Sequence, residues 1–407
     1  MKALKYFLNT IYLYLAQGIN LIFPILIYPF LIDKISLEGF GIIILLQVIM
    51  NYGTTLVDYG YNLIGTNEVS NSKSYENLAS IVSKVLVVKF ILLVLSFLMV
   101  FVSVFFIKPL QGKCEIVFLG WLNVVGIGLY PIWYFQGKEE MQLIGIINLV
   151  SKLVTIVGIL LFIKGADDIN LTVFFLSLSS VLCALFSWIY IYVRDKLRFS
   201  LPTPLEVISD LRIGFSIFLS NILVQLYSNF VLIISTGMLN TVEIGILGVY
   251  LKLRDVFVSV IGPIQQAVYP ELSKLINSKL VKKTRELIRK TLFVLFSISI
   301  ITSLGYYAFF DYINKLLFEN NAEVLDMLAF LCILLIAPYG GLITRVLVAN
   351  KKNKFVFLST FFSGLFALVT SHIMVYKFSL KGALYVIFFS YLLNVVMGSY
   401  FLIKKKL

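Results

Sequence analysis

Long apolar stretches separated by short polar breaks run through the whole chain. A helix needs about 20 predominantly apolar residues to cross a bilayer. The longest polar segments, 65–78, 194–211 and 271–290, are too short for a folded extramembrane domain. The pattern therefore predicts an all-α polytopic membrane protein with twelve spans: 6–32, 39–64, 79–107, 115–136, 142–163, 171–193, 212–236, 244–270, 291–313, 323–349, 355–376 and 382–403.

The distribution of Lys and Arg predicts which side of the membrane each loop faces. Cytoplasmic loops carry an excess of these residues in membrane proteins. With the N-terminus inside, the inner segments hold 22 of the 34 cations and the outer loops hold seven. We therefore expect both termini to be cytoplasmic.

The two halves of the chain resemble each other at an offset of about 204 residues. The segment Asn67–Ser70 (NEVS) is similar to Pro270–Ser273 (PELS), and Asn71–Lys73 (NSK) recurs at Asn277–Lys279. Parallel six-helix repeats are a transporter architecture, although apolar helices can also be similar by chance. We expect two pseudo-symmetric lobes, 1–193 and 212–407, joined by a cytoplasmic linker at 194–211.

Composition narrows the class of protein. Of 407 residues, 60% are apolar and 14% are charged, against roughly 25% charged in soluble domains. This excludes a soluble enzyme, a disordered chain and, despite the net charge of +13, a nucleic-acid partner. No nucleotide-binding loop or metal-spaced His/Cys cluster occurs in the sequence, so we expect no enzymatic activity, no cofactor and no metal site.

Five cations fall inside the expected spans. Charged residues at that depth are costly and usually mark a functional pathway. By helical rise, three of the five lie near the middle of their spans, and the other two lie near the inner ends, where extension of the side chain to the interface is an alternative. We expect a cationic substrate site from Lys152, Lys252 and Arg254 at mid-span, with Arg345 and Lys89 nearer the inside.

Amide and acidic residues in the spans are candidates for lining and coupling. Asn221, Gln225 and Asn229 share one helix face at i, i+4 and i+8, and Gln17 and Asn20 occupy the first span. We expect a polar cavity lining, with contacts between helices as the alternative. Asp58 and Asp255 are candidates for a coupling proton or sodium ion; helix–helix hydrogen bonding for Asp58 and an ion pair with Lys252 for Asp255 are the alternatives.

Three segments carry a family resemblance. Val57–Asn62 (VDYGYN) is similar to a V-D-Y-G-F-N segment, and Pro131–Met141 (PIWYFQGKEEM) to a P-x-W-x-F-Q-G-x-E-x-M turn. Lys252–Ser273 is similar to a K-I-R…G-P…Y-P-x-x-S run. On these residues the chain resembles the polysaccharide transporter family of MATE/MOP-type flippases, specifically the Wzx-type O-antigen flippases. It departs at Leu247-Gly248, where the family often has Tyr-Ser.

The resemblance implies a two-lobed, MATE-like transporter of the bacterial inner membrane. Its substrate would be an undecaprenyl-pyrophosphate-linked oligosaccharide repeat unit, for O-antigen or capsule, flipped from the cytoplasmic to the outer leaflet by alternating access. A polymerase and a chain-length regulator would be pathway partners. The main alternative is a MATE-type multidrug or cation antiporter, which would favour buried carboxylates over the embedded cations seen here. A membrane-bound glycosyltransferase is disfavoured by the short outer loops.

Overall fold

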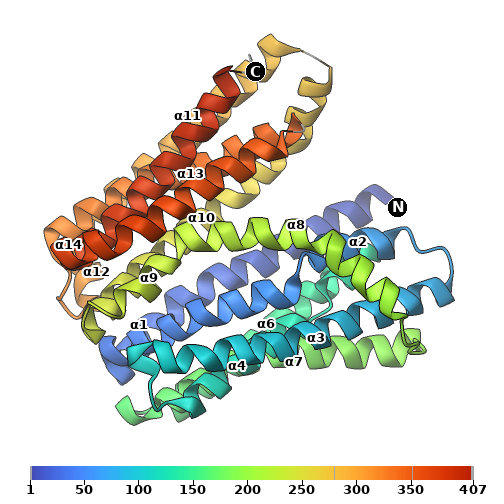
Figure 1. The fold of residues 1–407 in the computed structure, drawn as a ribbon, viewed down its shortest axis with the longest axis horizontal. Helices are drawn as coiled ribbons and strands as arrows, with labels where there is room; N and C mark the ends of the chain where they lie inside the picture. The colour runs from blue at the N-terminus through green and yellow to red at the C-terminus, as the bar shows by residue number, and fades with distance from the viewer. Residues whose placement is uncertain (1, 279, 351, 405–407) are drawn as a thin grey trace. The chain divides into compact units, whose positions relative to one another are not determined.

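The computed structural model describes residues 2–278, 280–350 and 352–404, without the side chains of 2–17, 19–22, 25, 263, 266, 267, 270, 277, 353, 403 and 404. Contacts divide the chain into two compact units, Met1–Ile222 and Leu223–Leu407. The elements described are helical (Figure 1): α1 (Lys2–Asp58), α2 (Tyr61–Ser70), α3 (Tyr75–Phe106), η1 (Lys108–Leu110), α4 (Cys114–Leu129), α5 (Ile132–Gly137), α6 (Met141–Phe162), η2 (Ala166–Asp168), α7 (Ile169–Asp195), α8 (Pro204–Ser228), α9 (Phe230–Ser235), α10 (Thr241–Asn277), α11 (Val281–Ala308), α12 (Phe310–Leu317), α13 (Val324–Ala349) and α14 (Asn353–Lys404).

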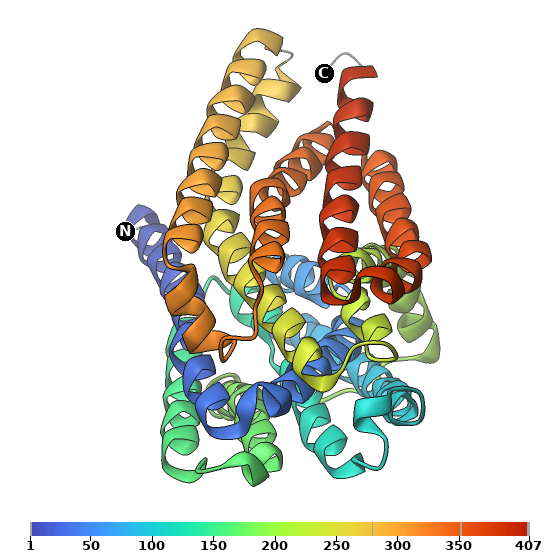
Figure 2. The ribbon, with the colours of Figure 1, turned by 90° about the vertical axis from the view of Figure 1, so that its left-hand side faces the viewer.

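Two of these elements, α1 and α14, each contain two helices that meet at a sharp bend. Ser36 in α1 has φ 66° and Ser379 in α14 has φ 50°, so neither residue continues the helix. In Figure 2 the two halves of α14 run back along each other, and Gly382 lies against the backbone of Met374. Both bends fall in the short polar breaks that the sequence places at 33–38 and 377–381.

The first unit is a bundle in which α1 contacts α3, α4 and α6, while α7 packs against α4 and α6. Figure 1 shows α3, α4, α6 and α7 running side by side. A glycine permits the α4–α7 approach, because a Cβ at Gly126 would overlap the backbone of Ser180. Small residues at such crossings are typical of helix packing in membranes.

The second unit is built around α13, which contacts α10, α11 and α14. Its inward face carries buried apolar side chains such as Phe330, Ile333 and Leu342. Helix α9 packs on α14. Each unit therefore has its own core, as expected for a compact structural unit.

The exposed surface of the helices is strongly apolar, as a lipid-facing surface must be. On α3, Phe90 is 67% exposed, and Phe105 and Phe106 are 75% and 81% exposed. Across the described ranges, nine helical segments are long and apolar enough to cross a membrane. Two of them, Leu26–Ser70 and Lys354–Leu402, contain the bends at Ser36 and Ser379. The prediction of an all-α polytopic membrane protein is confirmed, and the number of twelve spans stays a prediction.

Candidate functional site

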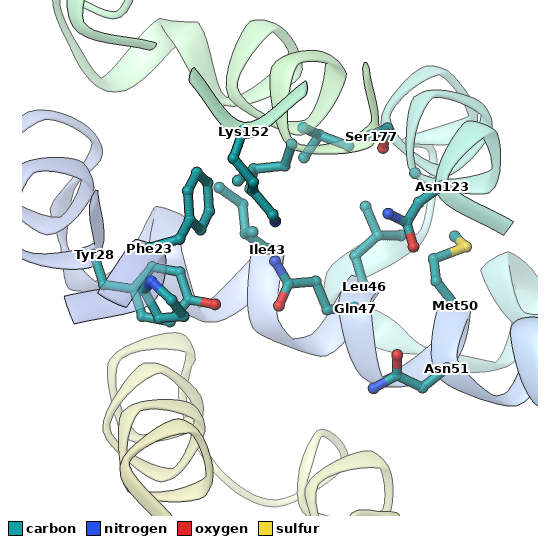
Figure 3. A pocket seen from close by; sticks show the side chains of 14 residues that line it. Phe23, Tyr28, Ile43, Leu46, Gln47, Met50, Asn51, Asn123, Lys152 and Ser177 are labelled. Atoms are coloured by element: carbon teal, nitrogen blue, oxygen red, sulfur yellow. The ribbon is translucent and has the colours of Figure 1, made fainter. Parts of the chain in front are cut away.

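A cavity in the first unit lies between the two parts of α1 and helices α4, α6 and α7 (Figure 3). Its volume is about 200 Å³, below the roughly 300–1,000 Å³ of sites that enclose a drug-sized molecule. The cavity can therefore hold a small polar group rather than a whole oligosaccharide. Its polar lining comes from four helices: Gln47 and Asn51 on α1, Asn123 on α4, Lys152 on α6 and Ser177 on α7.

Lys152 brings a positive charge to this cavity. Its side chain is half-buried, and its Nζ lies 4.0 Å from the centroid of the Phe23 ring. In Figure 3 the ammonium group points into the space between Phe23 and Gln47. A cation over an aromatic face is stabilised by about 0.5–2 kcal/mol, more where water is excluded. Lys152 is thus a cation in the wall of a cavity.

Lys89, on α3, has a different environment. Its side chain is 3% exposed, and its Nζ donates a hydrogen bond of 2.7 Å to the carbonyl oxygen of Gly128 in the last turn of α4. The last carbonyls of a helix lack donors within the helix, and Pro131, which follows, has no N–H to offer. The indole of Trp188 donates to the neighbouring carbonyl of Leu129 at 2.7 Å. Lys89 and Trp188 together cap the end of α4.

Asp58 lies at the break between α1 and α2. Its carboxylate lies near the backbone N–H groups of Gly60 and Asn62, and it interacts electrostatically with Lys89. Tyr59 and Gly60 have φ values of 46° and 89°, which a sharp turn requires. The VDYGYN segment therefore forms a sharp turn that places the Asp58 carboxylate next to the N-terminus of α2, where the helix carries partial positive charge.

Arg254, on α10, is the most deeply buried of the three predicted cations in the second unit, which are Lys252, Arg254 and Arg345. Its side chain is 3% exposed. The guanidinium donates to the carbonyl of Ser228 at 2.6 Å and to Oδ1 of Asn229 at 2.9 Å. It also donates two hydrogen bonds to Oδ1 of Asp255, at 3.1 and 2.6 Å. The Tyr391 ring centroid is 5.9 Å from the guanidinium carbon.

This arrangement explains why α8 stops where it does. Asn229 leaves the helical conformation at φ −131°, so Ser228 is the last residue of α8. The end of a helix carries partial negative charge on its free carbonyls, and Arg254 neutralises it. Asn229 is held in turn by Gln225, whose Oε1 accepts its amide hydrogen bond at 2.7 Å.

The remaining predicted site residues lie around or apart from these clusters. Lys252 is half-buried on α10, where it interacts electrostatically with Asp255 and Arg254, and the Asp255 side chain is 50% exposed. Asn221 is exposed. The side chains of Gln17 and Asn20 lie outside the described residues.

Arg345, on α13, belongs to a separate cluster. It donates to Oε1 of Gln265 and, at 3.2 Å, to the carbonyl of Gly341. Gln265 is 5% exposed and its amide donates to the carbonyl of Pro338 at 2.6 Å. The pair ties α10 to α13. Gln265 was not among the predicted site residues, although the amide pair Gln265-Gln266 in an apolar run was the signal that could have indicated it.

The aromatic turn of the resemblance is a packing element. Trp133, Tyr134 and Phe135 on α5 are all fully buried, and the Trp133 ring lies 3.0 Å from the place where a Cβ of Gly65 would stand. Glycine at position 65 of α2 is therefore what allows α5 to pack on α2.

Two carboxylates, one at the end of α7 and one in the first turns of α8, fasten these two helices to the same unit. Asp195 accepts hydrogen bonds from the Tyr134 hydroxyl and, at 3.0 Å, from Lys138. Asp210 accepts from the Tyr61 hydroxyl at 3.2 Å and pairs with Lys84 at 3.0 Å. Each acid is thus held by one tyrosine and one lysine of the first unit.

Comparison with known proteins places the chain in a family. The sequence model of the family described as "Polysaccharide biosynthesis protein" matches residues 7–276. The chain belongs to this family. The polysaccharide biosynthesis family was the expectation raised by the resemblance, and that expectation is confirmed.

Two curated relatives carry the name "Putative O-antigen transporter". The protein from Escherichia coli K12 is 29% identical over 271 residues, which are 65% of this chain and 64% of that protein. The protein from Shigella dysenteriae is 26% identical over 268 residues, which are 66% of this chain and 67% of its own length.

Solved transporters share the fold. An inward-facing multidrug resistance MATE family transporter of the MOP superfamily superposes with a TM-score of 0.76 at 15% identity, covering 96% of this chain and 92% of its own. The lipid II flippase MurJ, in an inward closed conformation, superposes with a TM-score of 0.65 at 16% identity, covering 98% and 88%. The predicted MATE-like fold is confirmed.

Proposed function

We propose that this protein flips a lipid-linked oligosaccharide across the bacterial inner membrane. Its substrate is a repeat unit of O-antigen or capsule on undecaprenyl pyrophosphate, which moves from the cytoplasmic to the outer leaflet. The observation that carries the proposal is that the enclosed charge is positive: Lys152 lines a cavity of the first unit, and Arg254 is buried in the second. The chain that holds these cations belongs to the polysaccharide biosynthesis family. The names of its two curated relatives support it.

The chemistry of the substrate fits these cations. A pyrophosphate is strongly anionic, and a guanidinium or ammonium in a low-dielectric site binds phosphate oxygens through short, charge-assisted hydrogen bonds. The small volume of the Lys152 cavity suits a phosphate or one acidic sugar. The lipid tail stays in the bilayer, and the glycan passes through the protein.

The wider architecture follows the same proposal. Twelve spans with cytoplasmic termini are supported by the lysine and arginine distribution and by the bends at Ser36 and Ser379, which let α1 and α14 cross twice. Two lobes, 1–193 and 212–407, with the linker 194–211, alternate between inward-open and outward-open states. A proton or sodium ion drives this transport cycle. A polymerase and a chain-length regulator act on the flipped repeat unit. The protein itself catalyses no reaction.

The test is flipping in liposomes by the purified protein. A fluorescent polyprenyl-pyrophosphate oligosaccharide is followed by its accessibility to a membrane-impermeant quencher. We expect protein-dependent flipping that falls at least about tenfold in Lys152→Met and in Arg254→Lys, the loss of one charge-assisted contact. Lys290→Met is the matched control, because Lys290 is exposed and pairs only with Glu286 within the described residues.

Two results would overturn the proposal. One is wild-type flipping in both Lys152→Met and Arg254→Lys at normal folding and expression. The other is an absence of flipping together with uptake of a lipophilic cation, which would make the protein a MATE-type multidrug or cation antiporter.

A further inference from the structure

A second polar cluster is buried in the second unit, away from the predicted site residues. It contains Asp326 in the first turn of α13, Tyr250 on α10 and Tyr306 on α11, whose side chains are 2%, 1% and 8% exposed. Asp326 interacts electrostatically with both tyrosines. Among the described residues, Oδ1 of Asp326 has no partner at hydrogen-bond distance and angle. The two phenol hydroxyls interact with each other and have no other hydrogen-bond partner in that part of the chain.

Aromatic rings hold the two tyrosines in place. The centroid of Phe330 lies 4.9 Å from that of Tyr250 and 5.2 Å from that of Tyr306. Phe318 packs on Tyr250 at 4.8 Å, and Phe310 packs on Tyr306 at 6.1 Å. The hydroxyls are therefore fixed polar ends in an otherwise apolar wall, and reaching other partners would require disrupting this packing.

The charges around the cluster leave it negative. Oδ2 of Asp326 accepts a hydrogen bond of 3.1 Å from the backbone N–H of Glu323, so Asp326 helps to cap α13. Capping uses only Oδ2 and leaves Oδ1 without a role. Lys381 from α14 forms its ion pair with Glu323, at 2.7 Å, and interacts with Asp326 only electrostatically. Glu243 of α10 also faces Asp326 and accepts a hydrogen bond from Ser379 at 2.5 Å. Three carboxylates are thus opposed by one ammonium group.

We propose that Asp326, Tyr250 and Tyr306 form a binding site for one positive charge, either a proton or a sodium-sized cation. A buried carboxylate without a counter-charge costs several kcal/mol, and this cost disappears when the group takes up a proton or a cation. Carboxylate and hydroxyl oxygens are ligands that hard cations prefer. Because Asp326 carries one negative charge, one proton or one monovalent cation is enough to neutralise it.

The position of Tyr250 connects this site to transport. Tyr250 lies four residues before Arg254 on α10, so both side chains lie on one face, one turn apart. Uptake of a positive charge at Tyr250 would bias the helix that holds Arg254. This connection rests on the proposed function, whereas the binding of the charge does not.

The experiment measures binding without any lipid-linked substrate. Full-length protein in lipid nanodiscs is assayed for binding of radioactive sodium ions, and its thermal unfolding is followed in sodium chloride and in choline chloride at equal ionic strength, at several pH values. If the occupant is sodium, we expect saturable binding and stabilisation by sodium chloride. If it is a proton, we expect no sodium effect and a gain of stability as the pH falls, because acid neutralises the buried carboxylate.

Variants separate a binding site from a merely structural cluster. Asp326→Asn is expected to weaken sodium binding at least about tenfold, or to remove the gain of stability in acid. Tyr250→Phe and Tyr306→Phe, which keep the packing, should each weaken sodium binding about threefold or reduce the acid effect. Asp311→Asn is the control, because Asp311 is an exposed acid in the first turn of α12.

The proposal is overturned if Asp326→Asn responds to sodium and to pH as the wild type does. It is also overturned if the variant is uniformly less stable at every sodium concentration and pH, since that result indicates only a structural role. If Asp326→Asn does not fold, the two Tyr→Phe variants decide in the same way. A failure of flipping with intact sodium or proton binding would instead contradict the proposed transport function.

Discussion

The predicted intramembrane cations have two different environments: the end of a helix and the wall of a cavity. Lys89 and Arg254, one in each unit, both donate to carbonyls at the end of a broken helix: Gly128 in α4 and Ser228 in α8. Lys152 instead lies in a cavity wall, over the Phe23 ring. A cation enclosed by carbonyls is separated from any solute by the groups that it caps, whereas a solute inside the cavity would lie beside the Lys152 side chain. Burial alone therefore does not identify a substrate contact.

The largest effect should come from Arg254→Ala. The substitution leaves the Ser228 carbonyl, the Asn229 amide oxygen and Asp255 without their donor, and breaking a buried pair in this way costs about 3–5 kcal/mol. Because Asp255 is 50% exposed, we expect the lower end of that range. Thermal unfolding in detergent measures the loss. Arg254→Lys, which keeps the charge, should recover part of the stability, and equal melting of Ala and Lys variants would contradict the capping role.

A smaller loss of stability should follow Lys89→Met. Methionine keeps the volume but leaves the Gly128 carbonyl without a donor and Asp58 without its cation, at a cost of about 1–3 kcal/mol. A double-mutant cycle with Asp58→Asn measures the Lys89–Asp58 coupling by thermal unfolding. If the two substitutions are additive, Lys89 acts only as the α4 cap.

The smallest change in stability should follow Lys152→Met, together with a large loss of flipping. Lys152 is half-buried at a cavity wall, so its removal disturbs little packing, and the cation–π contact with Phe23 accounts for about 0.5–1 kcal/mol of the loss. The cavity meanwhile loses its positive charge. The ratio of initial flipping rate to folded fraction measures this separation. Lys164→Met, at an exposed loop lysine, is the matched control. A melting temperature that falls as far as that of Arg254→Ala would remove the distinction between cap and cavity wall.

Much of the candidate site could be predicted from the sequence, because its polar and charged residues lie inside apolar segments of membrane length. Charged and amide side chains stand out in apolar spans, which is why Arg254, Gln225 and Asn229 were predicted, and the structure brings these three together. The sequence could not pair them, because Arg254 is 25 residues from Asn229 and no local spacing encodes that contact. The contact of Gln265 with Arg345 could not be predicted for the same reason, since the two residues are 80 positions apart.

Two other features could be recognised only in the folded structure. Asp326 lies at the start of an expected span, where a carboxylate is unremarkable as a helix cap, and only its contacts reveal that one oxygen has no partner among the described residues. Likewise, the aromatic turn at Pro131–Met141 carries the family resemblance, but its packing on Gly65 is a property of the fold.

By itself, the sequence determined the class of protein and its family, because apolar stretches of membrane length and local motifs are written in consecutive residues. The tertiary structure decided what each enclosed charge does. Its role depends on which carbonyl, carboxylate, ring or cavity lies beside it, and these neighbours come from helices far apart in the chain. In a low-dielectric interior those neighbours dominate the energy of a charge, so the same residue type becomes a helix cap in one place and a cavity wall in another.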